Sequence, residues 1–261
     1  MHLGNGAITP ECVAITLSAA TAGLGLCAWS LRRERTSVSK LGLAAALGAF
    51  SFAAQAVNVP LLPGISAHLV GGVLLAWALG PATGALTMAL VLAVQALLLG
   101  DGSMLALGAN VINMALIPAG LVALGRQFNW LPSGNFKANP REMAVIGTLS
   151  ALAVVAAAGL IAVEMALFRG GSELVQWSAF AQQLLSVHLL VAVGEGAASV
   201  LLAAALAWIA FPMPGRASRL RPALAAAAMA LLAALAIPLS SELPDGFEHA
   251  AQQSGQASWL K

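Results

Sequence analysis

The chain of 261 residues is 60% hydrophobic and only 8% charged, whereas soluble domains carry roughly 25% charged residues. This composition excludes a soluble globular domain and predicts an all-α integral membrane protein, a polytopic bundle, because long apolar segments in lipid satisfy their backbone groups within helices. The formal net charge of +2 is spread over short loops, so the sequence offers no surface for a nucleic acid.

The start of the chain does not resemble a secretory signal. Residues 1–11 contain no Lys or Arg, whereas a signal peptide begins with a basic segment. The basic cluster Arg32, Arg33 and Arg35 instead follows the first apolar stretch. We therefore expect a membrane helix that starts outside the cell, and we expect Met1 to be retained.

Apolar runs separated by turn residues and charges predict about eight transmembrane helices, with boundaries good to a few residues. Their approximate ranges are 12–31, 40–58, 67–80, 82–99, 107–125, 142–167, 182–211 and 222–238. The third is short and turns at Gly80-Pro81, so it need not cross the whole bilayer. The seventh is long for about 30 Å of hydrocarbon and has to tilt, kink or protrude.

The basic residues predict the orientation of these helices. With the N-terminus outside, ten of the twelve Lys and Arg residues fall in inner loops, as the positive-inside rule requires. The ten are Arg32, Arg33, Arg35, Lys40, Arg126, Lys137, Arg141, Arg216, Arg219 and Arg221. We therefore expect a multi-pass protein of the cytoplasmic (inner) membrane whose N-terminus and C-terminal tail are both extracytoplasmic.

Two histidines suggest a metal site on the outer side. Met1 and His2 offer an amine, an amide and an imidazole in sequence, and His68 begins the third apolar run from the same side. Four nitrogens in a plane favour Ni(II) or Cu(II) over tetrahedral zinc. The leader between His2 and Val13 spans up to about 36–40 Å when extended, so it can fold back into the bundle. The alternative is a chance Met-His start and an ordinary interfacial histidine.

Two further groups of polar residues could support such a site. Asp101 follows the fourth apolar run, and Asn110 and Asn113 lie three residues apart on one helical face. They could orient the histidines, since ligating histidines usually donate their other N–H to an acceptor, or they could join helices. His188 and Glu195, seven residues apart, share a helix face and predict either a functional pair or a buried structural contact.

These residues together resemble the CbiM/NikM family, the substrate-capture (S) components of energy-coupling factor (ECF) ABC transporters for nickel and cobalt. The resemblance covers about residues 1–211. The matching pieces are Met1-His2, Gly64–Gly72 around His68, Gln95–Gly102, Leu107–Met114, and His188 with Gly194-Glu195-Gly196. The tail Pro244-Asp245-Gly246-Phe247-Glu248 is similar to the Pro-Asp-Gly-Leu-Glu signature of a small accessory subunit.

The resemblance implies a capture domain over residues 1–211, with seven helices and an N-terminal segment that folds into the bundle. Residues 212–261 would form an accessory-like segment with one transmembrane helix and an outer tail. The metal would be held by the Met1 amine, by the amide and imidazole of His2, and by His68. The Gly-rich segment around His68 and the tail are closer to nickel-type members, and cobalt import for cobalamin synthesis is the alternative.

The implied partners are a transmembrane coupling (T) subunit, two ATP-binding subunits and a small accessory membrane subunit. The sequence contains no phosphate-binding Gly-x-x-x-x-Gly-Lys-[Ser/Thr] motif, so we expect a transporter component rather than an enzyme, with no resident cofactor. An intramembrane enzyme is the alternative of another class. It would use Ser66 or Glu195 as the reacting group and His68 or His188 as the base.

Overall fold

The computed structural model describes residues 2–3, 7–32, 37–131, 139–168, 174–209 and 221–255, with the backbone alone for 174–176 and 209. Among these residues, seven helical segments are long and apolar enough to cross a membrane. The predicted all-α membrane fold is therefore confirmed. The segments run Pro10–Leu31, Val38–Gln55, Pro81–Leu98, Leu107–Gln127, Pro140–Phe168, Trp177–Trp208 and Arg221–Leu239.

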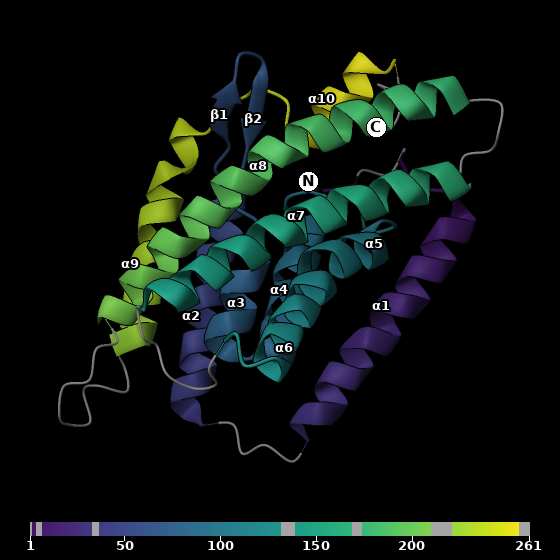
Figure 1. Ribbon diagram of the computed structural model, residues 1–261. Helices are drawn as coiled ribbons and strands as arrows, with labels where there is room; N and C mark the ends of the chain where they lie inside the picture. The colour runs from purple at the N-terminus through teal and green to yellow at the C-terminus, as the bar shows by residue number, and fades with distance from the viewer. Residues whose placement is uncertain are drawn as a thin grey trace.

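These segments correspond to labelled helices in Figure 1. The first three are α1 (Pro10–Leu31), α2 (Val38–Gln55) and α4 (Pro81–Leu98), and the fifth is α7 (Pro140–Phe168). The fourth is continuous but irregular, and consists of α5 (Leu107–Val111), a π-helical turn (Ile112–Leu116) and α6 (Ile117–Gln127). The last two lie within α8 (Leu174–Ile209) and within α9 (Arg221–Ala236) followed by a 3₁₀ turn (Ile237–Leu239).

The expectation of about eight spans was too high by one. In place of the third predicted span, residues 67–80, the structure has the eight-residue helix α3 (Gly72–Leu79). This helix is about 12 Å long, much less than a bilayer requires. The helix cannot extend towards the N-terminus, because Gly71 directly before it has a positive φ of 75°, which is not a helical conformation. The preceding residues form a β-hairpin, β1 (Val59–Leu62) and β2 (Ile65–Ala67), instead of a helical turn.

Local chemistry explains where several helices begin. Thr9 caps α1 by accepting a hydrogen bond from the Cys12 N–H, and Pro10 occupies the first turn, where its missing N–H costs nothing. Gly80, with φ of 93°, makes the sharp turn between α3 and α4, and Pro81 then starts α4. Small residues let the helices approach closely. A Cβ on Gly84 would lie 2.5 Å from the Ala76 Cα of α3.

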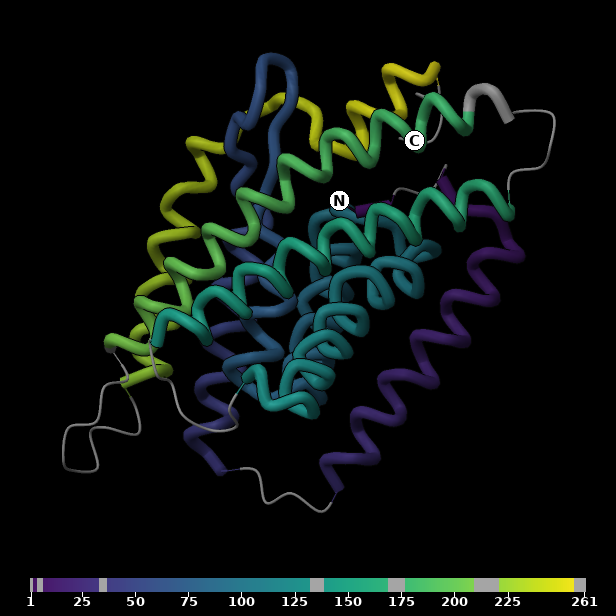
Figure 2. Tube along the Cα trace, viewed as in Figure 1, coloured from purple at the N-terminus to yellow at the C-terminus, as the bar shows by residue number. Residues whose placement is uncertain are grey.

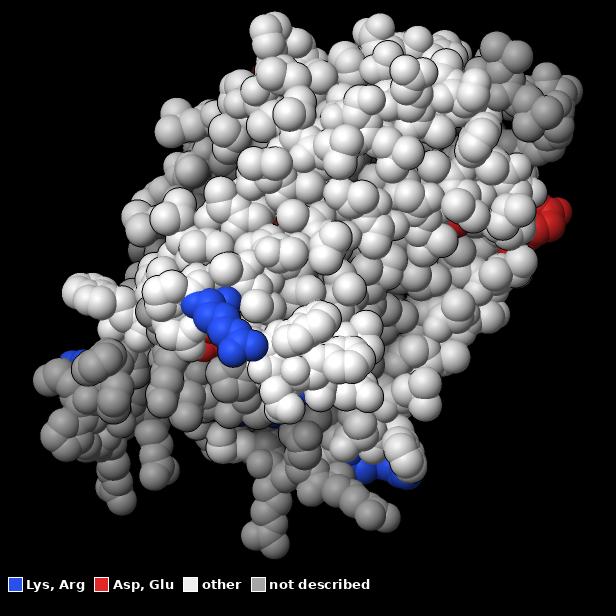
Figure 3. Space-filling view, in the orientation of Figure 1, with Lys and Arg blue, Asp and Glu red and all other residues white. Residues whose placement is uncertain are grey.

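Figures 1 and 2 show the arrangement of the bundle, in which α7 and α8 run side by side and α1 lies along one edge. Helix α9 packs against α2, and the short helix α10 (Gly246–Gln253) packs against α8. The hairpin stands at the same end of the bundle as α10 (Figure 1). In Figure 3, the Lys and Arg side chains visible on this face lie in its lower half, and uncharged side chains cover its middle. A wide uncharged belt is what a bilayer requires.

The C-terminal tail is joined to the hairpin by hydrogen bonds. The Ser66 N–H donates to the Pro244 carbonyl at 2.9 Å, and the Ser66 hydroxyl donates to the Leu243 carbonyl at 2.6 Å. The Ser241 N–H donates to the Asn58 carbonyl at 2.8 Å. Helix α10 is fixed by a capping box between Asp245 and Glu248, and its Phe247 packs edge-on against Phe180 of α8. The tail is therefore packed and hydrogen-bonded against the first 211 residues at the hairpin end of the bundle.

Candidate metal site

His2 and His68 lie together at the hairpin end of the bundle, although 65 residues separate them in the sequence. Their rings are stacked, with centroids 5.4 Å apart and planes inclined by 11°. This juxtaposition is the central feature of the site. Met1, the third proposed contributor, lies outside the described residues.

The segment that carries His68 is held in place by two neighbouring helices. The carboxylate of Glu195 in α8 accepts hydrogen bonds from the N–H groups of Val70 and Gly71, both at 2.8 Å. From α2, the Gln55 side-chain amide donates to the Val70 carbonyl at 2.8 Å. These bonds satisfy backbone groups that a continuous helix would have paired internally. Glu195 therefore acts on the site through the backbone next to His68.

The hydrogen bonding of His68 settles which ring nitrogen can bind a metal. Burial lowers the pKa of His68 to about 3, with further contributions from the positive charges of the amino terminus and of His2. The ring is therefore neutral at pH 7. Its Nδ1 lies 3.2 Å from the Leu69 carbonyl, which can only accept, so Nδ1 carries the proton. The lone pair is then on Nε2, as in a histidine prepared for a metal ion.

His2 is buried, with 7% of its side chain exposed, and its Nδ1 lies 3.1 Å from a carboxylate oxygen of Asp101. Its Nε2 is buried and has no hydrogen-bond partner among the described residues. Burial raises the pKa of Asp101, but the hydrogen bond and the charge of His2 outweigh it, so the pKa of Asp101 is lower than usual. Asp101 is therefore in contact with His2, and the other ring nitrogen of this histidine is buried without a partner among the described residues.

The first residues of the chain are anchored inside the bundle. The Leu3 N–H donates to the side-chain carbonyl of Asn110 at 3.0 Å, and the Leu3 carbonyl accepts from the Ser103 N–H at 3.1 Å. Leu3 itself is buried. Gly102, at φ of 76°, packs against His2, because a Cβ there would lie 3.4 Å from the His2 Cβ. Asn110 thus fixes the start of the chain.

Of the remaining predicted residues, His188 lines a cavity together with His68, whereas Asn113 lines a different one. Asn113 lines a small cavity with Glu195, Val70 and Gly72, and no contact with a histidine is seen there. His188 Nδ1 lies 2.7 Å from the Leu184 carbonyl one turn earlier in α8. His188 and Glu195 thus have separate partners. The shared helix face does not make them a pair.

Ser66, a candidate nucleophile in the alternative interpretation, is fully buried, and its hydroxyl is bonded to carbonyls of the tail. Glu195, the other candidate, is bonded to two backbone N–H groups. Neither residue is arranged as a nucleophile beside a base. The geometry therefore gives no support to an intramembrane enzyme.

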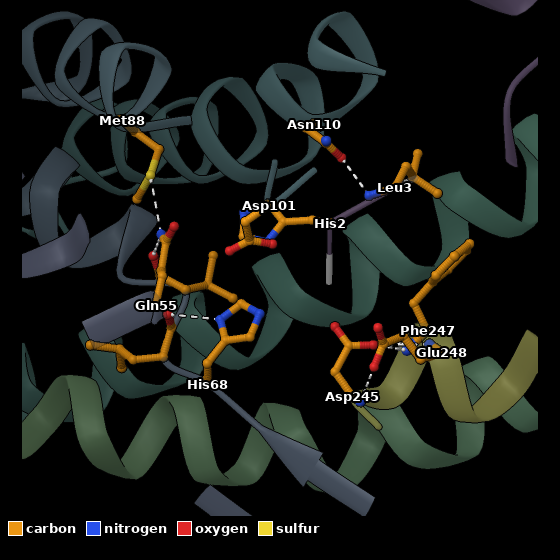
Figure 4. Close-up of polar contacts among 12 residues, drawn as sticks. His2, Leu3, Gln55, His68, Met88, Asp101, Asn110, Asp245, Phe247 and Glu248 are labelled. Carbon is orange, nitrogen blue, oxygen red and sulfur yellow. Dashed lines mark hydrogen bonds and ion pairs between the residues drawn. The ribbon is translucent and has the colours of Figure 1, made fainter. Parts of the chain in front are cut away.

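One residue of the site was not singled out from the sequence. Asp245 of the tail lines a cavity of about 10 Å³ together with His68, His188 and Gly246. Figure 4 shows Asp245 and the two site histidines, His2 and His68, around one space. The Asp-x-x-Glu spacing at Asp245 and Glu248 would have predicted that a helix begins here. It could not have predicted that Asp245 lies beside His68.

The described side chains alone do not make a complete metal site. Among the described residues, no group of three His, Cys, Asp or Glu side chains is placed to hold a metal ion. Two imidazoles leave a divalent ion under-coordinated, so any metal here needs further donors. An amine and a deprotonated amide would complete a planar set of four nitrogens, a geometry suited to Ni(II).

Comparison with known proteins identifies the family. Residues 2–213 match the family model CbiM, described as "Cobalt uptake substrate-specific transmembrane region". The chain belongs to the CbiM family. The matched region contains both site histidines and ends before the tail that carries Asp245.

The relatives include proteins named for nickel and for cobalt. The chain is 42% identical over 117 residues to a putative fused nickel transport protein NikMN of Archaeoglobus fulgidus. The aligned region covers 45% of this chain and 38% of the relative. It is 32% identical over 168 residues to the fused nickel transport protein NikMN of Rhodobacter capsulatus. This aligned region covers 63% of this chain and 46% of the relative. The chain thus spans less than half the length of these two relatives.

Two solved structures share the fold. A crystal structure of a transition metal transporter superposes with a TM-score of 0.65 and 26% identity, covering 81% of this chain and 95% of that one. A truncated transition metal transporter gives a TM-score of 0.63 and 28% identity, covering 77% and 96%. The fold of these transition metal transporters therefore extends over most of this chain.

Proposed function

We propose that this CbiM-family chain is the substrate-capture component of an energy-coupling factor transporter and binds Ni(II) at the hairpin end of the bundle. The observation that carries the proposal is the stacking of the His2 ring on the His68 ring, with the proton of His68 on Nδ1. The names of the relatives, which include nickel transport proteins, support it.

The proposed ligands are the Met1 amine, the His2 amide and imidazole, and His68 Nε2. A small chelate ring that includes the His2 amide closes through Nδ1, the ring nitrogen nearer to the main chain. In the structure this nitrogen contacts Asp101. We therefore expect the metal to replace Asp101 as the partner of Nδ1 and to leave the carboxylate beside a cationic centre.

Nickel is preferred because four nitrogens in a plane suit Ni(II). Cobalt remains the alternative substrate, in line with the description of the matching family model and with import for cobalamin synthesis. For inward transport the chain would require a transmembrane coupling subunit and two ATP-binding subunits, since its own sequence has no phosphate-binding loop. A small accessory membrane subunit is a further expected partner.

We also propose that the hairpin end faces the extracytoplasmic side of the inner membrane, because the basic residues gather in the other set of loops. A reporter fused after Ser240 should then be outside and one fused after Arg219 inside. Both reporters on one side of the membrane would contradict this orientation.

The decisive experiment is metal analysis of the purified protein after nickel, cobalt, copper and zinc are offered together. We expect about one nickel ion per chain, and its loss in the His68→Ala variant. The matched control is His249→Ala, which removes a histidine of α10 that does not line the site cavity. Retention of nickel by His68→Ala, or a chain that selects zinc, would refute the proposed site.

A further inference from the structure

The C-terminal tail brings a carboxylate to the site from outside the region that matches the family. Asp245 lines the same small cavity as His68, and the cavity is completed by His188, Gly246 and apolar residues. Glu242 and Glu248, the other acidic residues of the tail, are exposed. Asp245 is therefore the tail carboxylate directed towards the histidines (Figure 4).

The tail is held tightly over this cavity. Ser66, two residues before His68, bonds to the carbonyls of Leu243 and Pro244. Gly246 lies so close to His188 that a Cβ would come within 2.8 Å of the His188 ring. Phe247 is buried with 1% exposure and packs on Phe180. Asp245 consequently has little freedom to move away from the site.

Capping of α10 does not by itself explain an aspartate at position 245. Both capping bonds, from the N–H groups of Phe247 and Glu248, end on Oδ1. Ser, Thr or Asn would cap the helix about as well without a charge.

A charge balance gives this carboxylate a role. A divalent ion bound by two neutral imidazoles, a neutral amine and one amide anion has a net charge of +1, which the carboxylates of Asp101 and Asp245 both offset. A charge removed from water is stabilised only when an opposite charge or hydrogen bonds compensate it.

On the basis of the proposed function, we infer that Asp245 is a counter-charge for the bound metal ion, supplied by the tail and held outside the coordination sphere. The tail thereby closes the site and strengthens retention of the ion. The inference deepens the proposed function, because it assigns part of the metal site to a segment that lies beyond residue 213, where the family match ends.

The test is the nickel affinity of the full-length Asp245→Asn variant, measured by titration. Asparagine preserves the helix cap and removes only the charge. We expect the affinity to fall by about 10–100-fold, the range typical for groups that support metal ligands. The absorption spectrum of the nickel-saturated variant should match that of the wild type, because the ligand set is unchanged. Glu248→Gln is the matched control, since it removes an exposed charge of the same helix, and its affinity should stay within about twofold.

Each other outcome overturns the inference in a distinct way. Wild-type affinity in Asp245→Asn shows that no counter-charge is needed, and an equal loss in Glu248→Gln shows a general effect of tail charge. A changed spectrum makes Asp245 a ligand. If Asp245→Asn does not fold, Asp245→Ser, another neutral cap, takes its place with the same expectations. A wild-type chain that binds neither nickel nor cobalt refutes the proposed function together with the inference. Normal binding by Asp245→Asn beside loss in His68→Ala refutes the inference alone.

Discussion

The two ends of the bundle both bury polar side chains but treat them differently. At the end opposite the hairpin, Glu142 accepts a hydrogen bond from the Trp77 indole at 2.9 Å, and its backbone N–H donates to Asn139 at 2.8 Å. Arg126 donates through Nη2 to the Trp77 carbonyl at 2.9 Å, although its Nε is buried without a partner among the described residues. At the hairpin end, the Nε2 of His2 is buried without a partner among the described residues.

This difference indicates that the polar cluster around Glu142 stabilises the fold and that the cluster around His2 binds a ligand. A buried polar group without a partner costs roughly 1–3 kcal/mol, so each one needs an explanation, and a bound ligand is one such explanation. The carboxylate of Glu142 is engaged by groups of the protein itself and joins α7 to Trp77 of α3. At the hairpin end the unpaired atom belongs to an imidazole that is stacked on a second imidazole, and we interpret this end as the binding end. Four predictions test this contrast, from the largest effect to the smallest.

The largest effect should come from one alanine added before Met1. The insertion leaves both histidines and all helices in place, but it turns the Met1 amine into an amide and moves the free amine one residue away. We expect nickel binding to be lost as completely as in His2→Ala, with unchanged expression and thermal stability. Normal binding by the extended chain, measured by titration, would exclude the amine as a ligand.

The second effect is the dependence of nickel affinity on pH. His68 is already neutral at pH 7, because burial lowers its pKa to about 3, so it releases no proton when the metal binds. An α-amine in free peptides has a pKa of about 7.7–8.0, and the amide has to lose its proton. Each proton released per metal lowers the affinity about tenfold per pH unit on acidification. We expect a fall of about 100-fold or more between pH 8 and 6, and release of less than one proton per metal would argue against amide coordination.

The third test compares a carboxylate at each end. Glu195→Ala removes the acceptor of the Val70 and Gly71 N–H groups beside His68, so we expect nickel affinity to fall about 10–100-fold. Glu142→Ala leaves the Trp77 indole without its acceptor and should cost roughly 1–3 kcal/mol of stability while leaving affinity unchanged. Thermal melts and titrations of both variants measure the two quantities. Equal effects of the two variants on affinity would remove the contrast between the ends.

The smallest effect is expected at His249. This residue belongs to α10, three positions after Gly246, but it does not line the cavity shared by His68 and Asp245. His249→Ala should therefore leave nickel affinity within about twofold of the wild type. A large loss of affinity would mean that the tail contributes a histidine ligand, and the proposed ligand set would have to change.

The sequence by itself determined the class of fold and the main candidates of the site. Its apolar runs predicted seven of the membrane helices, because lipid forces each spanning segment to pair its own backbone. His2, His68 and Asp101 were identifiable, since ionisable groups near a membrane span are costly without a role. The resemblance pointed to the family that comparison with known proteins then identified.

Tertiary structure alone decided how the third apolar run folds and which residues meet. Its composition is as hydrophobic as that of a spanning helix, but the backbone at Gly71 and the acceptors Glu195 and Gln55 make an irregular, anchored segment possible. Those acceptors come from α8 and α2, far away in the sequence. The same holds for Asp245, which lies 177 residues after His68. A local pattern of hydrophobicity reports what a segment buries, whereas partners across the bundle depend on packing between helices that no local pattern encodes.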